Sequence, residues 1–127
     1  MQLTLHRPGE KFTIRSVDED GFKVGDKTYN NSIVISSTDL LPEWSPQNTA
    51  ELSAEHFEAI FVQEPELVLI GTGKKQVFLS PDLLGEFIQR GVGIECMNTM
   101  AACRTFNVLV SEDRRVTAAL MPVRSRV

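Results

Sequence analysis

The chain has 127 residues, of which 42% are hydrophobic and 24% charged, and its formal net charge is −4. This length suits one conventional core, so we expect residues 1–127 to form a single domain. The acidic balance disfavours nucleic-acid binding, which depends on clustered Lys and Arg. The N-terminal sequence MQLTLHRPGEKF lacks the apolar region of a secretory signal, and no stretch is apolar enough to cross a bilayer. We therefore expect a cytoplasmic protein without membrane insertion.

The N-terminal third is typical of a β-meander, which we place at about residues 10–36. Apolar and polar residues alternate over residues 12–15, and the alternation resumes after a turn at residues 18–21. Gly25 begins a two-residue hairpin turn, because glycine accepts the positive φ that such turns require. The third strand of the meander is expected within residues 27–36, with Ile33, Val34 and Ile35 at its centre.

Residues 40–46 contain two prolines, which remove backbone donors and predict a loop. Trp44 lies between these prolines. It has two interpretations: a side chain that covers the edge of the core, or an exposed anchor for a partner protein.

The remaining part, about residues 52–122, alternates helices with strands and therefore indicates the α/β class with parallel strands. Two successive strand–helix–strand units should be right-handed, with their strands side by side. The expected elements are a helix at 53–62, a strand at 67–70, a helix at 81–90, a strand at 92–97, a helix at about 100–110 and a strand at 116–121.

The helix at 81–90 has the strongest signals. Ser80 is a good N-cap, Pro81 suits the first helical position, and Gly91 ends the helix. Its apolar residues are spaced as one buried face, and they are Leu83, Leu84, Phe87 and Ile88.

The turn Gly71-Thr72-Gly73 directly follows the strand at 67–70, so it should lie at the carboxyl edge of the sheet. Glycines there allow a tight turn, and they also let backbone amides approach an anion closely. The spacing matches neither the dinucleotide-binding signature nor a P-loop. A plain turn and an anion-binding turn both remain open.

Asn98 and Thr99 lie at the same edge, where they either cap the following helix or help its N-terminus attract a carboxylate or phosphate. On that helix Arg104 and Asn107 share one face, which Ser111 continues at the next turn. The neighbouring residues are mostly apolar. This polar face therefore either satisfies loop carbonyls or lines a cleft for a ligand or partner.

No group of residues forms a catalytic constellation. Cys103 lacks a histidine base nearby in the pattern, so we interpret it as a small buried thiol. Cys96 and Cys103 are seven residues apart and no paired ligand motif accompanies them, which disfavours zinc. Glu95 alternates with Cys96 as an outward-facing strand residue would. We expect no catalytic residue, no metal and no cofactor, and we favour a protein that is not an enzyme over a catalytic one.

Several segments resemble one family: Gly71-Thr72-Gly73, Gly91-Val92-Gly93-Ile94-Glu95, and especially residues 98–107 and 115–122. It is the small domain of unknown function shared by mitochondrial complex I assembly factor 3 and adipogenesis-associated proteins, with many stand-alone bacterial members. The resemblance implies three layers (β+β/α), in which the meander packs with a mixed sheet and the helices lie on one side. The chain departs from the family pattern at Met100, near an expected glycine, and at Phe106, where tyrosine is common.

The resemblance and the missing catalytic groups favour a non-enzymatic protein-interaction or assembly-factor-like domain. Its protein partner is unidentified and would belong to a membrane-associated complex. The alternative is a small-anion or nucleotide-binding domain, either a binding protein or an enzyme, that uses the Gly71–Gly73 turn, the helix start at Asn98–Thr99, and Arg104.

Overall fold

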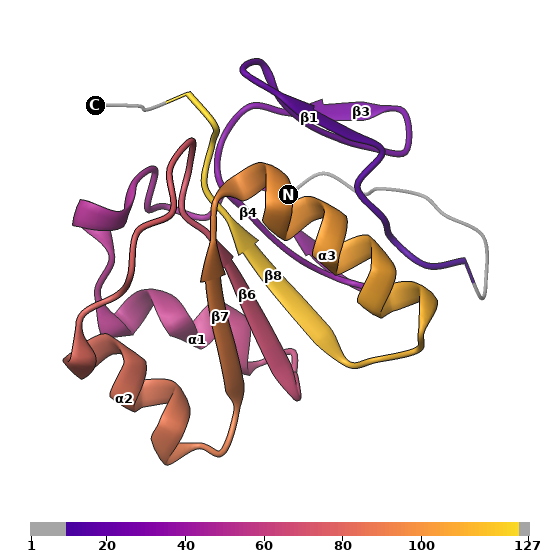
Figure 1. Cartoon of the computed structure of the whole chain (residues 1–127). Helices are drawn as coiled ribbons and strands as arrows, with labels where there is room; N and C mark the ends of the chain where they lie inside the picture. Colours follow the sequence, from indigo (N-terminus) through magenta and orange to yellow (C-terminus); the bar gives the residue numbers. More distant parts are fainter. Residues whose placement is uncertain (1–9, 125–127) are drawn as a thin grey trace.

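The computed structural model describes residues 10–124 (Figure 1). Within this range the elements follow one another as β1 (Ser16–Asp18), β2 (Gly21–Val24), β3 (Lys27–Tyr29), β4 (Ile33–Ser36), β5 (Leu40–Leu41), the 3-10 helices η1 (Thr49–Glu51) and η2 (Ala54–Phe57), α1 (Glu58–Phe61), β6 (Leu67–Gly71), α2 (Pro81–Gln89), β7 (Gly93–Met97), α3 (Thr99–Ser111) and β8 (Val116–Leu120).

The strands form two sheets. A three-stranded antiparallel sheet has the order β1-β2-β3, and a five-stranded sheet has the order β5-β4-β8-β6-β7. In the larger sheet β6 is parallel to both β7 and β8, whereas β4 is antiparallel to β8. The predicted combination of a meander and a mixed sheet with parallel strands is therefore confirmed.

The third strand of the meander was wrongly placed, because residues 27–36 contain two strands in different sheets. β3 completes the meander, and β4 joins the larger sheet by pairing with β8. All four residues of β4 are buried. Such a strand needs neighbours and cover on both faces, which an exposed hairpin does not provide.

Two further boundaries differ from the prediction. Phe12 and Ile14 are buried in alternation as expected, but the paired strand begins later, at Ser16. The expected loop at 40–46 begins with β5, whose Leu40 pairs with Ile35 of β4. Both boundaries are set by hairpin pairing with an adjacent strand, because Ser16 is paired with Lys23 of β2 and Leu40 with Ile35 of β4.

The helices cover both faces of the larger sheet (Figure 1), so the expectation of helices on one side is wrong. Phe106 of α3 shares a buried cluster with Phe22 of the meander. Phe57 and Phe87, from η2 and α2, belong to a cluster on the opposite face. The second crossover also differs: β8 lies next to β6 and not beside β7. A right-handed connection that returns across β6 must pass over the other face of the sheet.

β6 connects the two sides of the core because its side chains alternate between them. Leu69 belongs to the cluster shared with α3 and the meander, whereas Val68 and Ile70 belong to the cluster under α1 and α2. Trp44 is buried in the second cluster, and its Nε1 donates to the carbonyl of His56 at 3.0 Å. Trp44 therefore covers the core, and its interpretation as an exposed anchor was wrong.

The apolar face of α2 is narrower than predicted. Phe87 is fully buried, but Ile88 is 72% exposed. α2 packs beside the edge strand β7, so part of its apolar surface extends beyond the sheet (Figure 1). None of the helices within residues 10–124 has the length and apolar character of a membrane span.

Replacing Phe106 by alanine should lower the free energy of unfolding by about 3–5 kcal/mol, because it opens a cavity between α3, the sheet and the meander. Val108 lies on the same helix but is 55% exposed, so Val108→Ala should change stability by less than about 0.5 kcal/mol. Urea denaturation of both variants measures the difference. Equal stabilities would contradict this assignment of the α3 core face.

Candidate functional site

Thr99 fastens the start of α3 to the ends of two strands. Its side chain is fully buried. The Thr99 hydroxyl donates to the carbonyl of Met121 at 2.7 Å and accepts from the amide of Gly73 at 2.8 Å. The Thr99 amide donates to the Gly73 carbonyl, also at 2.8 Å. Every polar group of this residue that points inward thus has a partner within the protein.

Glycine is required at both positions of the Gly71–Gly73 turn, but for a different structural reason at each. A Cβ on Gly71 would lie 2.9 Å from a methyl carbon of Leu120 and 3.0 Å from the Thr99 hydroxyl. Gly73 has φ +100°, a conformation that side chains disfavour. The close approach of α3 and the turn itself therefore account for both glycines.

The N-terminus of α3 uses its donors internally. The side chain of Asn98 caps the helix by accepting from the amide of Ala101 at 2.9 Å. The Thr99 amide is bonded to Gly73, as described above. This arrangement reduces the number of amides that an anion could reach at this helix start.

The polar face of α3 divides into two different environments. Asn107 is bonded twice to the backbone of Ile14: its Oδ1 accepts from the amide and its Nδ2 donates to the carbonyl, both at 2.8 Å. The Ser111 hydroxyl donates to Val108 of its own helix at 2.6 Å. Arg104 is exposed and makes no hydrogen bond or ion pair with another residue of 10–124. Asn107 thus holds the segment before β1, whereas Arg104 faces solvent.

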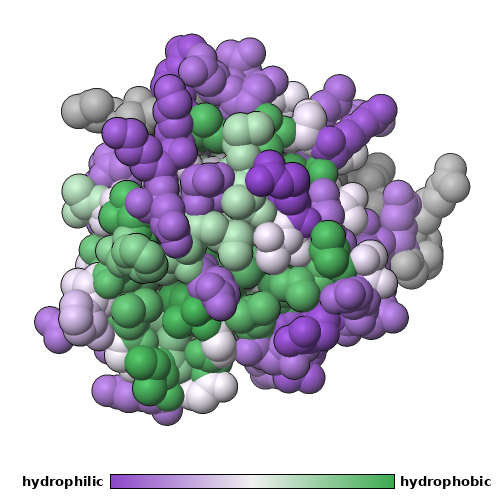
Figure 2. Space-filling view, in the orientation of Figure 1, coloured by the Kyte–Doolittle hydropathy of each residue, from purple (hydrophilic) through white to green (hydrophobic). Residues whose placement is uncertain are grey.

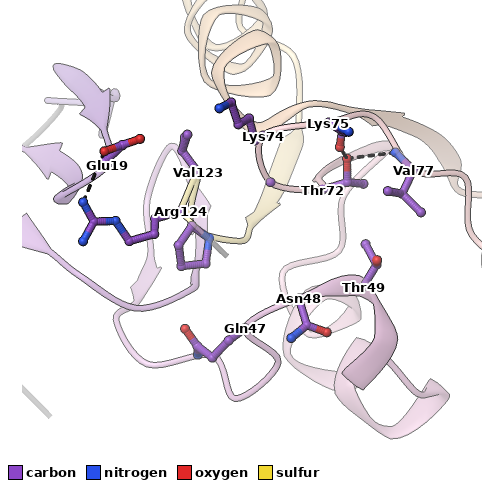
Figure 3. A pocket seen from close by; sticks show the side chains of 12 residues that line it. Glu19, Gln47, Asn48, Thr49, Thr72, Lys74, Lys75, Val77, Val123 and Arg124 are labelled. Carbon is purple, nitrogen blue, oxygen red and sulfur yellow. Dashed lines mark hydrogen bonds and ion pairs between the residues drawn. The ribbon is translucent and has the colours of Figure 1, made fainter. Parts of the chain in front are cut away.

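A cleft of about 460 Å³ lies beside the Gly71–Gly73 turn (Figure 3). Only Thr72 and Gly73 of the seven predicted site residues line it, so the structure does not gather the whole set in one place. The other lining residues come from four segments: Glu19, Gln47 to Thr49, Lys74 to Val77 without Gln76, and Pro122 to Arg124. The adjacent lysines after the glycine turn were the sequence signal that could have indicated this cleft.

The thiols are poor nucleophiles. Burial raises the pKa of Cys103 to about 12, against a smaller opposing effect of Arg104. Burial also raises the pKa of the half-buried Cys96. Both effects favour the protonated thiol over the reactive thiolate. Within residues 10–124 no three His, Cys, Asp or Glu side chains gather as a metal site would require.

A family model described as "Protein of unknown function (DUF498/DUF598)" matches residues 14–121. The NADH dehydrogenase (ubiquinone) 1 alpha subcomplex assembly factor 3 of Mus musculus is 33% identical over 112 residues, which are 86% of this chain and 60% of that protein. The chain thus spans less than two thirds of that relative.

Two bacterial proteins are similar over most of both lengths. The "13 kDa major membrane protein" of Francisella tularensis subsp. holarctica is 30% identical over 95 residues, or 73% of this chain and 76% of that protein. The crystal structure of a Bordetella parapertussis protein superposes with a TM-score of 0.84 at 32% identity, and covers 89% of this chain and 97% of that one. The described fold is therefore shared with an experimentally determined structure.

The Thr99 hydroxyl should be needed for stability. Thr99→Val keeps the shape but leaves the Gly73 amide and the Met121 carbonyl without their partner, which should cost roughly 2–4 kcal/mol. Thr99→Ser keeps the hydroxyl and should cost only about 1 kcal/mol, for the lost methyl group. Chemical denaturation compares them, and a Thr99→Val variant as stable as wild type would refute the structural role.

Asn107→Ala should leave the Ile14 amide and carbonyl unpaired and cost roughly 1–2 kcal/mol. The exchange of the Ile14 amide hydrogen with solvent, followed by NMR, should become faster while amides in β6 keep their protection. Ser111→Ala, on the exposed end of the same helix, is the control and should change neither quantity. Unchanged exchange at Ile14 in the Asn107 variant would be inconsistent with the observed pairing.

Proposed function

The chain belongs to the family of proteins of unknown function DUF498/DUF598, and on that premise we propose that it is a non-enzymatic protein-interaction domain of the assembly-factor kind. The observation that carries the proposal is the 33% identity, across 86% of the chain, to a protein described as an assembly factor. The Francisella relative is named a membrane protein, which supports a role beside a membrane-associated complex, and we place the domain on the cytoplasmic side of that complex.

The surface supports binding to a protein. Figure 2 shows apolar side chains gathered over α2 and the edge strand β7. Ile88, on α2, is 72% exposed, and Phe78, which precedes that helix, is 77% exposed. Exposed apolar surface of this kind commonly marks a protein–protein contact.

The polar residues support the same function in a different way. Thr99 and Asn107 are committed to bonds within the protein, so they position the fold and leave little capacity for a small ligand. Arg104 is exposed on α3 without such commitments among the described residues. We assign Arg104 a partner contact, and we assign Gly71, Thr72, Gly73, Asn98, Thr99 and Asn107 the task of holding the fold that presents it.

The second candidate is a small-anion or nucleotide-binding domain. Its support is the cleft beside Thr72 and Gly73, where Lys74 and Lys75 add positive charge. A thermal-shift screen with phosphates, nucleotides and carboxylates tests it, because a ligand that binds the native state raises the unfolding midpoint. No shift at millimolar concentrations would exclude this candidate.

Affinity capture from cells that express the protein tests the leading function. Tagged wild-type protein should recover the same partner proteins in repeated captures, identified by mass spectrometry. Arg104→Ala should reduce the recovered partner by about tenfold, since arginine is enriched among residues that dominate interfaces. The thermal midpoint should stay unchanged, because the Arg104 side chain faces solvent.

Lys23→Gln in the meander is the matched control, since it also removes one positive charge. It should recover the partners as wild type does. Repeated captures that yield no partner above the tag alone would count against the assembly-factor function. If Arg104→Ala recovered as much partner as wild type, only the assignment of Arg104 as a partner contact would be refuted.

A further inference from the structure

We propose that the cleft beside Lys74 and Lys75 binds an acidic segment of the partner protein, and that an apolar residue of that segment packs on Phe78. This inference rests on the proposed function, because it names the chemistry of the partner. The cleft volume of about 460 Å³ is typical of sites that hold part of a ligand below the protein surface.

The charge of the cleft is opposite to that of the whole chain. The chain has a net charge of −4, yet three cationic residues and one carboxylate line the cleft. That carboxylate, on Glu19, is already paired with Arg124 at 3.2 Å. Lys74 and Lys75 are exposed and form no ion pair with another residue of the described range. The local excess of positive charge favours encounter with an acidic segment.

The turn that carries the lysines is held in place. The Thr72 hydroxyl donates to the carbonyl of Lys75 at 2.6 Å and accepts from the amide of Val77 at 3.1 Å. The side-chain amide of Gln76 donates to the carbonyl of Cys96 on β7 at 2.9 Å. Because the backbone is fixed before binding, the free energy of binding includes no entropic cost for ordering this turn.

The distribution of the cations suits a polypeptide better than one small anion. The lysines follow β6, whereas Arg124 follows β8 and lies on another wall of the cleft (Figure 3). Carboxylates spaced along a chain can contact both walls. A single phosphate would need donors that converge, and the amides of Thr99 and Ala101 at the nearby start of α3 are already bonded.

Phe78 supplies the apolar part of the site. Val77 lines the cleft, and the next residue, Phe78, is 77% exposed. Burial of an aromatic side chain provides interface energy, whereas exposed charge pairs contribute little individually. The combined surface therefore selects a segment in which acidic residues flank a large apolar one.

Fluorescence anisotropy with a labelled peptide, one phenylalanine flanked by glutamates, tests the proposal on the full chain. The wild type should bind it, and binding should weaken as salt is raised. Lys74→Gln/Lys75→Gln should weaken binding by about tenfold or more, equivalent to about 1.4 kcal/mol. Phe78→Ser should also weaken it. Lys23→Gln/Lys27→Gln removes the same charge from the meander and should leave binding unchanged, with thermal midpoints checked for all variants.

The proposal is overturned if the labelled peptide does not bind, or if it binds equally well to the Lys74/Lys75 double variant. It is also overturned if a glutamine-for-glutamate peptide binds as tightly, or if millimolar inorganic phosphate displaces the acidic peptide completely. Capture from cells separates this result from the proposed function. Partners recovered equally by wild type and the double variant would leave the assembly-factor function intact and refute the cleft, whereas no recovered partner would refute the function itself.

Discussion

The arrangement of the sheet and α3 depends on the buried hydroxyl of Thr99. This one group joins the residue after β8 to the turn after β6, while the adjacent backbone amide bonds the same turn. A buried polar group is costly unless its partners are present, so these contacts specify one position for α3. The close packing of Gly71 against Thr99 is a direct consequence, because a larger side chain would occupy the space of the contact.

β6 connects the position of α3 to the rest of the core. It pairs with a parallel strand on either side, and its side chains enter the cores on both faces. Movement of β6 would therefore disturb α3 and the meander on one face and α1 and α2 on the other. The carboxyl end of this strand leads directly into the turn that carries the exposed lysines. The core thus fixes the position of the cleft, although no lysine takes part in the core.

Local signals in the sequence were sufficient for several elements. Ser80 caps α2 and Asn98 caps α3, as the residue types indicated. Strand pairing was not predictable in the same way, since β4 pairs with β8 from the other end of the chain. Local periodicity holds no information about such a distant partner, and residues 27–36 were therefore assigned to one strand. Ile88 shows the same limit: its spacing suggested burial, but the sheet ends before it.

The candidate site shows why polar residue types alone were ambiguous. Asn107 could have lined a cleft, but its partner is the backbone of Ile14, 93 residues away. Substitution of a residue with such internal bonds changes stability and binding together. These residues therefore support the fold, and they do not by themselves mark a binding surface. Lys74 and Phe78 have exposed side chains on a turn whose backbone is held by the Thr72 hydroxyl. Substitutions there can alter recognition while the fold persists, which is the property that a partner-binding surface requires.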